Sequence, residues 1–91
     1  MTKRTFARRR VRCENGEEAA LLYRITEEKT DGITRYGAEI VMRRGREKER
    51  AAVRDLTASY GRIRDFLKRL SRNAVTPCTL REVAEDELNN S

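Results

Sequence analysis

The lysines and arginines of this chain are the residues whose type and spacing could support a chemical function, the binding of phosphate. Six of the 21 lysines and arginines, and none of the 15 acidic residues, lie in residues 1–13, so the rest of the chain carries 15 of each and the net charge of +6 arises at the N-terminus. Arginine and lysine bind phosphate, and such contacts give nucleic-acid binding that weakens with salt. A nucleic-acid-binding protein would use this segment and a basic helix face: Arg8, Arg9, Arg10, Arg12, Arg62, Lys68, Arg69 and Arg72.

The same charges have a structural explanation. An edge strand of a sheet carries charge that prevents edge-to-edge aggregation, and the basic N-terminal segment, residues 1–12, is expected to be either such an edge strand or an arm. A GC-rich genome would also favour arginine. We favour the structural explanation and keep nucleic-acid binding as the alternative function.

Catalytic chemistry has little support in the sequence. The chain has no histidine for general-base catalysis, and its five glycines are scattered rather than grouped in a phosphate-binding loop. Glu47 and Glu49 are paired carboxylates that could bind a metal or act as acid and base, but nothing else converges on them. We therefore expect no enzymatic activity, no catalytic or metal-binding residue, no cofactor and no small-molecule substrate.

Two cysteines, Cys13 and Cys78, bear on the cellular compartment. They cannot form a structural zinc site, which needs four cysteine or histidine ligands. No apolar run approaches the roughly 18 residues of a membrane span, and no apolar segment follows the first basic residues as in a secretory signal. The sequence thus predicts a single-domain cytoplasmic protein, residues 1–91, with no membrane partner. Reduced thiols are favoured there, and a disulfide between Cys13 and Cys78 is the alternative.

Residues 33–43 are the stretch around which the fold is expected to form. Apolar and polar side chains alternate there, which predicts a half-buried β-strand. Asp31-Gly32 before it predicts a two-residue hairpin turn that fixes the pairing with residues 19–28. The expected cross-strand pairs are Leu21 with Met42, Tyr23 with Ile40, Ile25 with Ala38, Arg24 with Glu39 and Glu28 with Arg35.

Two further turns extend this hairpin to a meander. Asn15-Gly16 predicts a hairpin, and a two-residue loop there would turn Arg8 and Arg10 to the apolar face unless a bulge or a longer loop shifts the register. Arg44-Gly45 is a weaker turn signal, because arginine is a poor residue at positive φ. That turn would place Ala38 opposite Ala51, Tyr36 opposite Val53 and Glu39 opposite Arg50. The expected strands are about 5–13, 19–28, 33–43 and 47–55.

After the last strand the apolar spacing changes to three and four residues, as in an amphipathic helix. A first helix over about 58–73 is expected to have Thr57 as its N-cap and to end at Asn73, with Gly61 allowing a close approach to the sheet. Thr79-Leu80-Arg81-Glu82 predicts a capping box that begins a second helix, about 79–89. The fold class is therefore α+β, an antiparallel β-meander of three to four strands with two C-terminal helices packed on one face.

The order of features from Tyr36 to Leu88 resembles a family of small, clostridial-type bacterial proteins known only as a domain of unknown function. The resemblance rests on Tyr36-Gly37 in a strand, Val53-x-Asp55-Leu56-Thr57 before a helix, Leu70, Val75-x-Pro77-x-x-Leu80 and Val83-x-x-Asp86-x-Leu88. It covers about residues 23–88 and leaves out the basic N-terminal segment. These motifs are structural, so the resemblance implies no activity, substrate or site.

The leading hypothesis is a small binding module that contacts a protein partner or a second copy of itself. Exposed sheet edges, and Leu22 beside Val41 on an otherwise polar face, favour such contacts. A basic first helix and an acidic second helix would be complementary in a symmetric dimer. The nucleic-acid alternative lacks stacking residues, because every aromatic side chain except Phe6 is expected in the core. These core aromatics are Tyr23, Tyr36, Tyr60 and Phe66.

Overall fold

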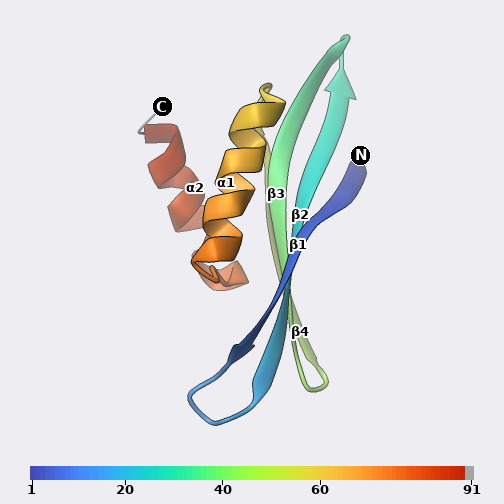
Figure 1. Ribbon diagram of the computed structural model, residues 1–91. Helices are drawn as coiled ribbons and strands as arrows, with labels where there is room; N and C mark the ends of the chain where they lie inside the picture. The colour runs from blue at the N-terminus through green and yellow to red at the C-terminus, as the bar shows by residue number, and fades with distance from the viewer. Residues whose placement is uncertain (90–91) are drawn as a thin grey trace.

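Two layers make up the structure, a computed structural model that describes residues 1–89 (Figure 1). One layer is an antiparallel sheet in the order β1-β2-β3-β4, and the other is a pair of helices on one face of that sheet. The elements are β1 (Thr2–Arg12), β2 (Glu18–Thr30), β3 (Ile33–Arg44), β4 (Glu47–Thr57), α1 (Tyr60–Arg72), the 3₁₀ turn η1 (Pro77–Thr79) and α2 (Leu80–Asn89). The expected α+β meander with two C-terminal helices is confirmed.

The central hairpin, β2 and β3, has the expected register. Its turn residues Asp31 and Gly32 both have positive φ, 53° and 79°, as a two-residue hairpin turn of this type requires. Thr30 therefore pairs with Ile33, and all five cross-strand pairs expected from the sequence are present. The apolar side chains of these pairs face the helices, whereas Arg24, Glu28, Arg35 and Glu39 lie on the open side of the sheet.

The turn between β3 and β4 is Gly45-Arg46, so the expectation of Arg44-Gly45 was wrong. Gly45 has φ 60°, and the glycine thus takes the conformation that is strained for arginine. The observed pairs are Ala38 with Val53, Glu39 with Ala52 and Tyr36 with Thr57, in place of Ala51, Arg50 and Val53. The first two pairs are shifted by two residues, so every side chain stays on its expected face.

The loop between β1 and β2 contains three residues, 14–16. Cys13 N donates to Glu17 O at 2.8 Å, and Gly16 N donates to Cys13 O at 2.9 Å. Gly16 has φ 84°, the left-handed conformation that commonly ends a three-residue hairpin loop. The pairing of the two strands is therefore shifted by one residue from that of a two-residue loop.

This shift decides which arginines of β1 face the helices. Arg9 lies opposite Leu21 on the helix side, whereas Arg8 lies opposite Leu22 on the open side. Placing Arg8 and Arg10 on the apolar face would have required the two-residue loop. The longer loop, which the sequence left open as an alternative, moves both to the open face.

A bulge in β4 depends on Gly37 of β3. Residues 54–56 lie opposite this single glycine, and Asp55 within the bulge has φ 58°. A Cβ atom on Gly37 would lie 2.3 Å from Val53 O and 2.7 Å from Thr26 Oγ1. Only glycine therefore fits at this position of β3.

The core lies between the sheet and the helices. Its buried residues are Ala19, Leu21, Tyr23, Ile25, Ala38, Ile40, Met42, Ile63, Phe66, Leu67, Leu70, Leu80 and Ala84. The hydroxyl of the fully buried Tyr23 donates to Val75 O at 2.9 Å and so ties the segment after α1 to the sheet. Burial raises the pKa of Tyr23 to about 12, although the nearby charge of Arg9 acts in the opposite direction.

Helix α1 begins two residues later than expected. Ser59 is its N-cap, with Oγ accepting from Arg62 N at 3.3 Å, whereas Thr57 Oγ1 accepts from Ser59 N. Gly61 is exposed, and a Cβ atom there would meet only Ser59 Oγ at 3.9 Å, so this glycine does not serve a close approach to the sheet. Asn73 caps the C-terminal end, as expected.

Two other expectations about the helical layer were wrong. η1 leads directly into α2, and Thr79 Oγ1 donates to Thr76 O instead of capping the helix. Tyr60 is 43% exposed rather than in the core, because it lies at the first position of α1 and packs edge-on against Tyr36, with ring centres 5.5 Å apart.

Candidate binding surface on the open face of the sheet

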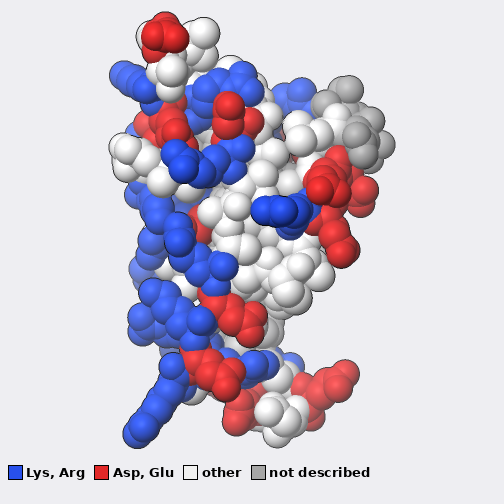
Figure 2. Space-filling view, turned by 180° about the vertical axis from the view of Figure 1, so that it is seen from behind, with Lys and Arg blue, Asp and Glu red and all other residues white. Residues whose placement is uncertain are grey.

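The face of the sheet that the helices leave uncovered carries a hollow lined mainly by basic side chains. Figure 2 shows lysine and arginine side chains running down the sheet side of the molecule, with a group of acidic side chains on the helix side. The hollow has a volume of about 420 Å³. Arg9 and Leu21 also line the hollow, but their side chains face the helices. We name the open-side residues the basic sheet face: its cations are Arg8, Arg10, Arg24, Arg43 and Lys48, and its floor is Ala20, Leu22 and Val41.

Strand register arranges the basic sheet face in two rows across the sheet. One row is Arg10, Ala20, Arg43 and Lys48, and the next is Arg8, Leu22, Val41 and Arg50. Cations thus stand on the outer strands β1 and β4, while the inner strands carry small or apolar side chains except at Arg43. Because neighbouring strands lie about 4.8 Å apart, the two outer strands are separated by about 14 Å. The surface is a shallow trough with basic walls.

Most cations of this trough have no acidic partner. Within residues 1–89, no ion pair involves Arg8, Arg43 or Lys48. Arg10 lies 3.9 Å from Glu18, but both side chains are largely exposed, so this pair is weak. The face therefore keeps a positive surplus that attracts anions.

One buried carboxylate, Glu39, lies beside the trough. Its side chain is fully buried and accepts from Lys3 Nζ at 3.0 Å, Arg24 Nη1 at 3.4 Å and Arg50 Nε at 2.5 Å. These partners come from β1, β2 and β4, so one carboxylate of β3 joins all four strands. Burial alone would raise the pKa of Glu39, but the hydrogen bonds from Lys3 and Arg50 outweigh it and lower the pKa. Glu39 is a charged anchor of the sheet.

Ion pairs at the β2–β3 hairpin end differ from those expected. Glu28 lies opposite Arg35, but its carboxylate accepts from Arg54 Nε at 2.6 Å, and Arg35 pairs with Asp55. The hydrogen bond from Arg54 lowers the pKa of Glu28. These pairs neutralise that end of the open face, so its positive surplus lies toward the other end, where the trough is.

The floor of the trough offers little apolar surface. Val41 is only 8% exposed, and Leu22 is half-buried. No aromatic side chain lines the trough in the described part of the chain. Leu22 and Val41, which the sequence singled out as a contact site, are thus mostly covered by neighbouring side chains.

The residues expected to bind nucleic acid lie on two different faces. Arg8, Arg10 and Arg12 follow the open face of β1, but Arg9 faces the helices and its Nη1 donates to Ser71 O at 2.9 Å. The other expected residues belong to α1, on the helix side (Figure 1): Arg62, Lys68, Arg69 and Arg72. Of these, Arg69 pairs with Glu87 of α2 and lies 5.8 Å from the ring centre of Phe66.

The arginines of the open sheet face counted in favour of nucleic-acid binding from the sequence, but Arg24, Arg43 and Lys48 were not among the residues named for it. Each lies on the open face because of its parity in a strand, and that signal was present in the alternating pattern. The β1 arginines that join them could not be assigned to the same face, because their parity depends on the length of one loop.

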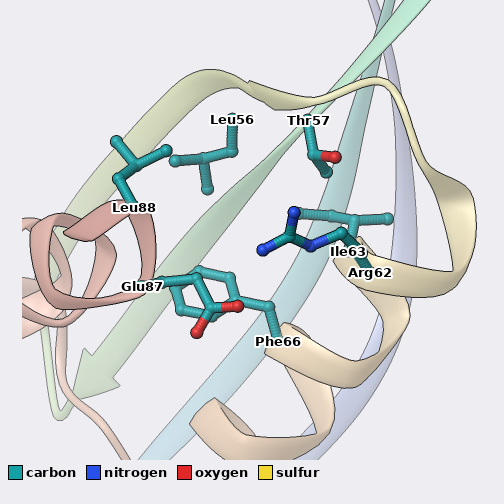
Figure 3. A pocket seen from close by; sticks show the side chains of 7 residues that line it. All are labelled: Leu56, Thr57, Arg62, Ile63, Phe66, Glu87 and Leu88. Atoms are coloured by element: carbon teal, nitrogen blue, oxygen red, sulfur yellow. The ribbon is translucent and has the colours of Figure 1, made fainter. Parts of the chain in front are cut away.

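A second hollow lies between α1, α2 and the end of β4. Figure 3 shows Phe66 and Ile63 at its base, with Leu56, Thr57, Arg62, Glu87 and Leu88 around it. Its volume is about 40 Å³, far below the roughly 300–1,000 Å³ of pockets that bind small molecules.

Other chemistry-bearing residues are dispersed. Among residues 1–89 no three His, Cys, Asp or Glu side chains lie close enough together to hold a metal ion. Glu47 accepts from Arg44 Nη2 at 3.0 Å, and both Cys13 and Cys78 are free thiols. No helix in this part of the chain combines the length and apolar character needed to cross a membrane.

The fold and the trough define a small two-layer α+β protein whose distinctive surface is an uncovered basic sheet face. The chain belongs to the family of unknown function DUF6514, whose model matches residues 2–90. This match includes the basic N-terminal segment, which the resemblance was expected to leave out. No curated protein and no solved structure matches the chain.

Proposed function

We propose that this protein is a non-catalytic binding module that contacts a polyanionic partner through the basic sheet face. The observation that carries the proposal is a sheet face left open by both helices, on which Arg8, Arg43 and Lys48 have no acidic partner within residues 1–89. Unpaired cations in a hollow concentrate the positive potential and steer anions toward it. The lining of the trough offers no nucleophile, general base or metal ligand.

A cytoplasmic setting in a bacterium of clostridial type is part of this proposal. Its support is the free state of Cys13 and of the exposed Cys78, since thiols persist in reducing compartments. A homodimer is the second form of the proposal, with contacts between the helical layers of two copies. A dimer through the edge strand β1 would set arginine against arginine, which is unfavourable.

The test is an NMR titration of the isotope-labelled protein with a heparin oligosaccharide, a general polyanion, alongside light scattering for mass. Amide and arginine Nε–H resonances of β1, β3 and β4 on the open face should shift together, saturate and return when salt is added. Shifts centred on α1, or no saturable shifts at low salt, would show that the basic sheet face is not the binding surface.

A further inference from the structure

We infer that the polyanion bound by the basic sheet face is the phosphate backbone of a nucleic-acid duplex. The inference rests on the proposed function and names the class of partner. A second copy, an acidic protein segment and a single nucleic-acid strand are the competing occupants of this face.

The kind of cation on this surface suits phosphate. Four of the five cations of the basic sheet face are arginines, and only Arg24 among those four contacts the buried carboxylate of Glu39. A guanidinium group presents a planar fork of donors that matches two phosphate oxygens. Arg8 and Arg43 keep their forks available, because they make no ion pair in the described part of the chain.

The spacing of the cations suits two backbone strands rather than one. Arg8 and Arg10 alternate along β1, about 7 Å apart. On β4, Lys48 lies in the row of Arg10, and Arg50, which is bonded to Glu39, lies in the row of Arg8. The walls of the trough are therefore separated by about 14 Å, a distance comparable to the roughly 12 Å width of a duplex major groove. A single strand would contact one wall and leave the other unused.

The side chains that would favour the competing occupants are missing from this face. All five aromatic residues lie elsewhere: Tyr23 and Phe66 in the core, Phe6 packed against it, and Tyr36 with Tyr60 beside the first turn of α1. A protein that binds single strands needs aromatic platforms for the bases. A protein partner needs an apolar or aromatic centre in the interface, and Val41 at 8% exposure does not supply one. A duplex, which buries its own bases and displays phosphates, needs neither.

A second copy of the chain is also a poor occupant. Its acidic side chains, such as Glu82, Glu85 and Asp86, lie on α2, and α2 covers the opposite face of the sheet from the trough. Docking α2 of one copy on the trough of another would be head-to-tail and would not close as a symmetric dimer. The duplex has no such constraint.

The test is fluorescence anisotropy with labelled DNA and RNA duplexes of about 20 base pairs, two helical turns, and with a thymidine single strand of equal length. Full-length protein is titrated at several salt concentrations, and poly-L-glutamate is added as a competitor. About four phosphate contacts predict that duplex affinity falls about 100-fold between about 50 and 200 mM salt. Duplexes should bind more tightly than the single strand, and polyglutamate should compete poorly.

Two triple variants with the same net charge locate the site. Arg8→Gln/Arg43→Gln/Lys48→Gln alters the trough at residues that make no ion pair with any part of residues 1–89, so the fold should be kept, which circular dichroism checks. This variant should lose at least about 30-fold in duplex affinity at low salt and show a shallower salt dependence. The matched control, Arg64→Gln/Lys68→Gln/Arg72→Gln, alters the exposed side of α1 and should lose less than about threefold.

Results that differ from these expectations would each contradict one part of the inference: the duplex as partner, the trough as the site, or the proposed function itself. Equal or tighter binding of the single strand rules out the duplex, and an equal loss in both triple variants rules out the location. If polyglutamate binds the trough and no duplex does, the partner is an acidic protein and the inference fails while the proposed function stands. If neither probe binds the trough at low salt, both fail together.

Discussion

The carboxylate of Glu39 holds cations of the open face of the sheet together. It is fully buried, and cations from three strands surround it. A buried charge is tolerated only when its partners neutralise it, and the same partners would repel one another without it. The anchor therefore stabilises the strand arrangement while leaving the neighbouring trough cationic.

Replacing this carboxylate with a neutral amide, Glu39→Gln, should destabilise the protein by about 2–3 kcal/mol. Breaking a fully buried ion pair costs about 3–5 kcal/mol, and the value is smaller here because Lys3, Arg24 and Arg50 are partly exposed. Urea unfolding at neutral pH measures the change. Glu28→Gln, at the exposed hairpin end, is the matched control and should cost much less; equal losses would contradict the anchor role.

The pKa of Glu39 predicts how stability changes in acid. Its pKa in the folded protein is lowered below the value of about 4.3 in the unfolded chain, so the folded state binds its proton less readily. The stabilisation is present above that unfolded value and is lost as the pH falls through the folded pKa. Between about pH 5 and pH 2, unfolding free energy should drop more steeply in the wild type than in Glu39→Gln. Parallel curves would contradict this.

Tyr23 gives the opposite prediction in alkali. Burial raises its pKa to about 12, so its contribution is complete below the unfolded value of about 10 and is lost as the pH rises toward about 12. Tyr23→Phe removes the bond to Val75 O and should cost about 1–2 kcal/mol at neutral pH. Absorbance titration should show a tyrosinate step near pH 12 in the wild type only.

At the scale of elements, Gly37 lies where only glycine fits, whereas Gly61 lies where alanine would also fit. Gly37→Ala would place a Cβ atom 2.3 Å from Val53 O, against backbone, and should destabilise by about 3 kcal/mol. Gly61→Ala, on the exposed side of α1, should stabilise by up to about 1 kcal/mol because alanine favours helix. Thermal unfolding of both variants compares them, and a loss in both would contradict the role given to Gly61.

The elements also show what the sequence could and could not predict. The β2–β3 register followed from the sequence because the Asp31-Gly32 turn, the apolar pairs and the charge pairs all agree. The β3–β4 turn could not be predicted in the same way, because a shift of two residues leaves every apolar side chain on the same face. Only the positive φ at the first turn residue, which suits Gly45 and not Arg44, distinguishes Gly45-Arg46 from Arg44-Gly45. For β1 the charges do not alternate, so the three-residue loop sets the parity of residues 7–12, and a bulge between Thr5 and Ala7 resets the parity of residues 2–5.

The candidate site could be predicted only in part, because the face of the β1 arginines depends on the parity of that strand. Arg24, Arg43 and Lys48 could be assigned to one face from strand parity alone. Whether Arg8 and Arg10 join them depends on the loop at residues 14–16, and so the trough itself could not be predicted. The bases of α1 share only their charge with the trough, since the two-layer arrangement puts them on the other side of the molecule.

At the scale of the whole molecule, the helices cover only part of the sheet. The molecule measures 46 × 26 × 17 Å, and the ends of the hairpins extend beyond the helical layer (Figure 1). Regions with little tertiary cover open most easily. Amide hydrogen exchange should therefore be faster in residues 12–18 and 44–48 than in residues 21–25 and 38–42. Mass spectrometry of peptic fragments tests this, and uniform protection along the strands would contradict it.

The order of the elements along the chain has a consequence for synthesis. Each strand pairs only with its neighbour in sequence, so the hairpins can form one after another as the chain leaves the ribosome. The helices that cover Leu21, Tyr23 and Ile40 are made last. A nascent chain whose sheet has formed but whose helices have not thus exposes an apolar face on one side of the sheet and a cationic face on the other. Stalling before residue 60 would leave the apolar side open to other chains and to chaperones, while the cationic side is already complete.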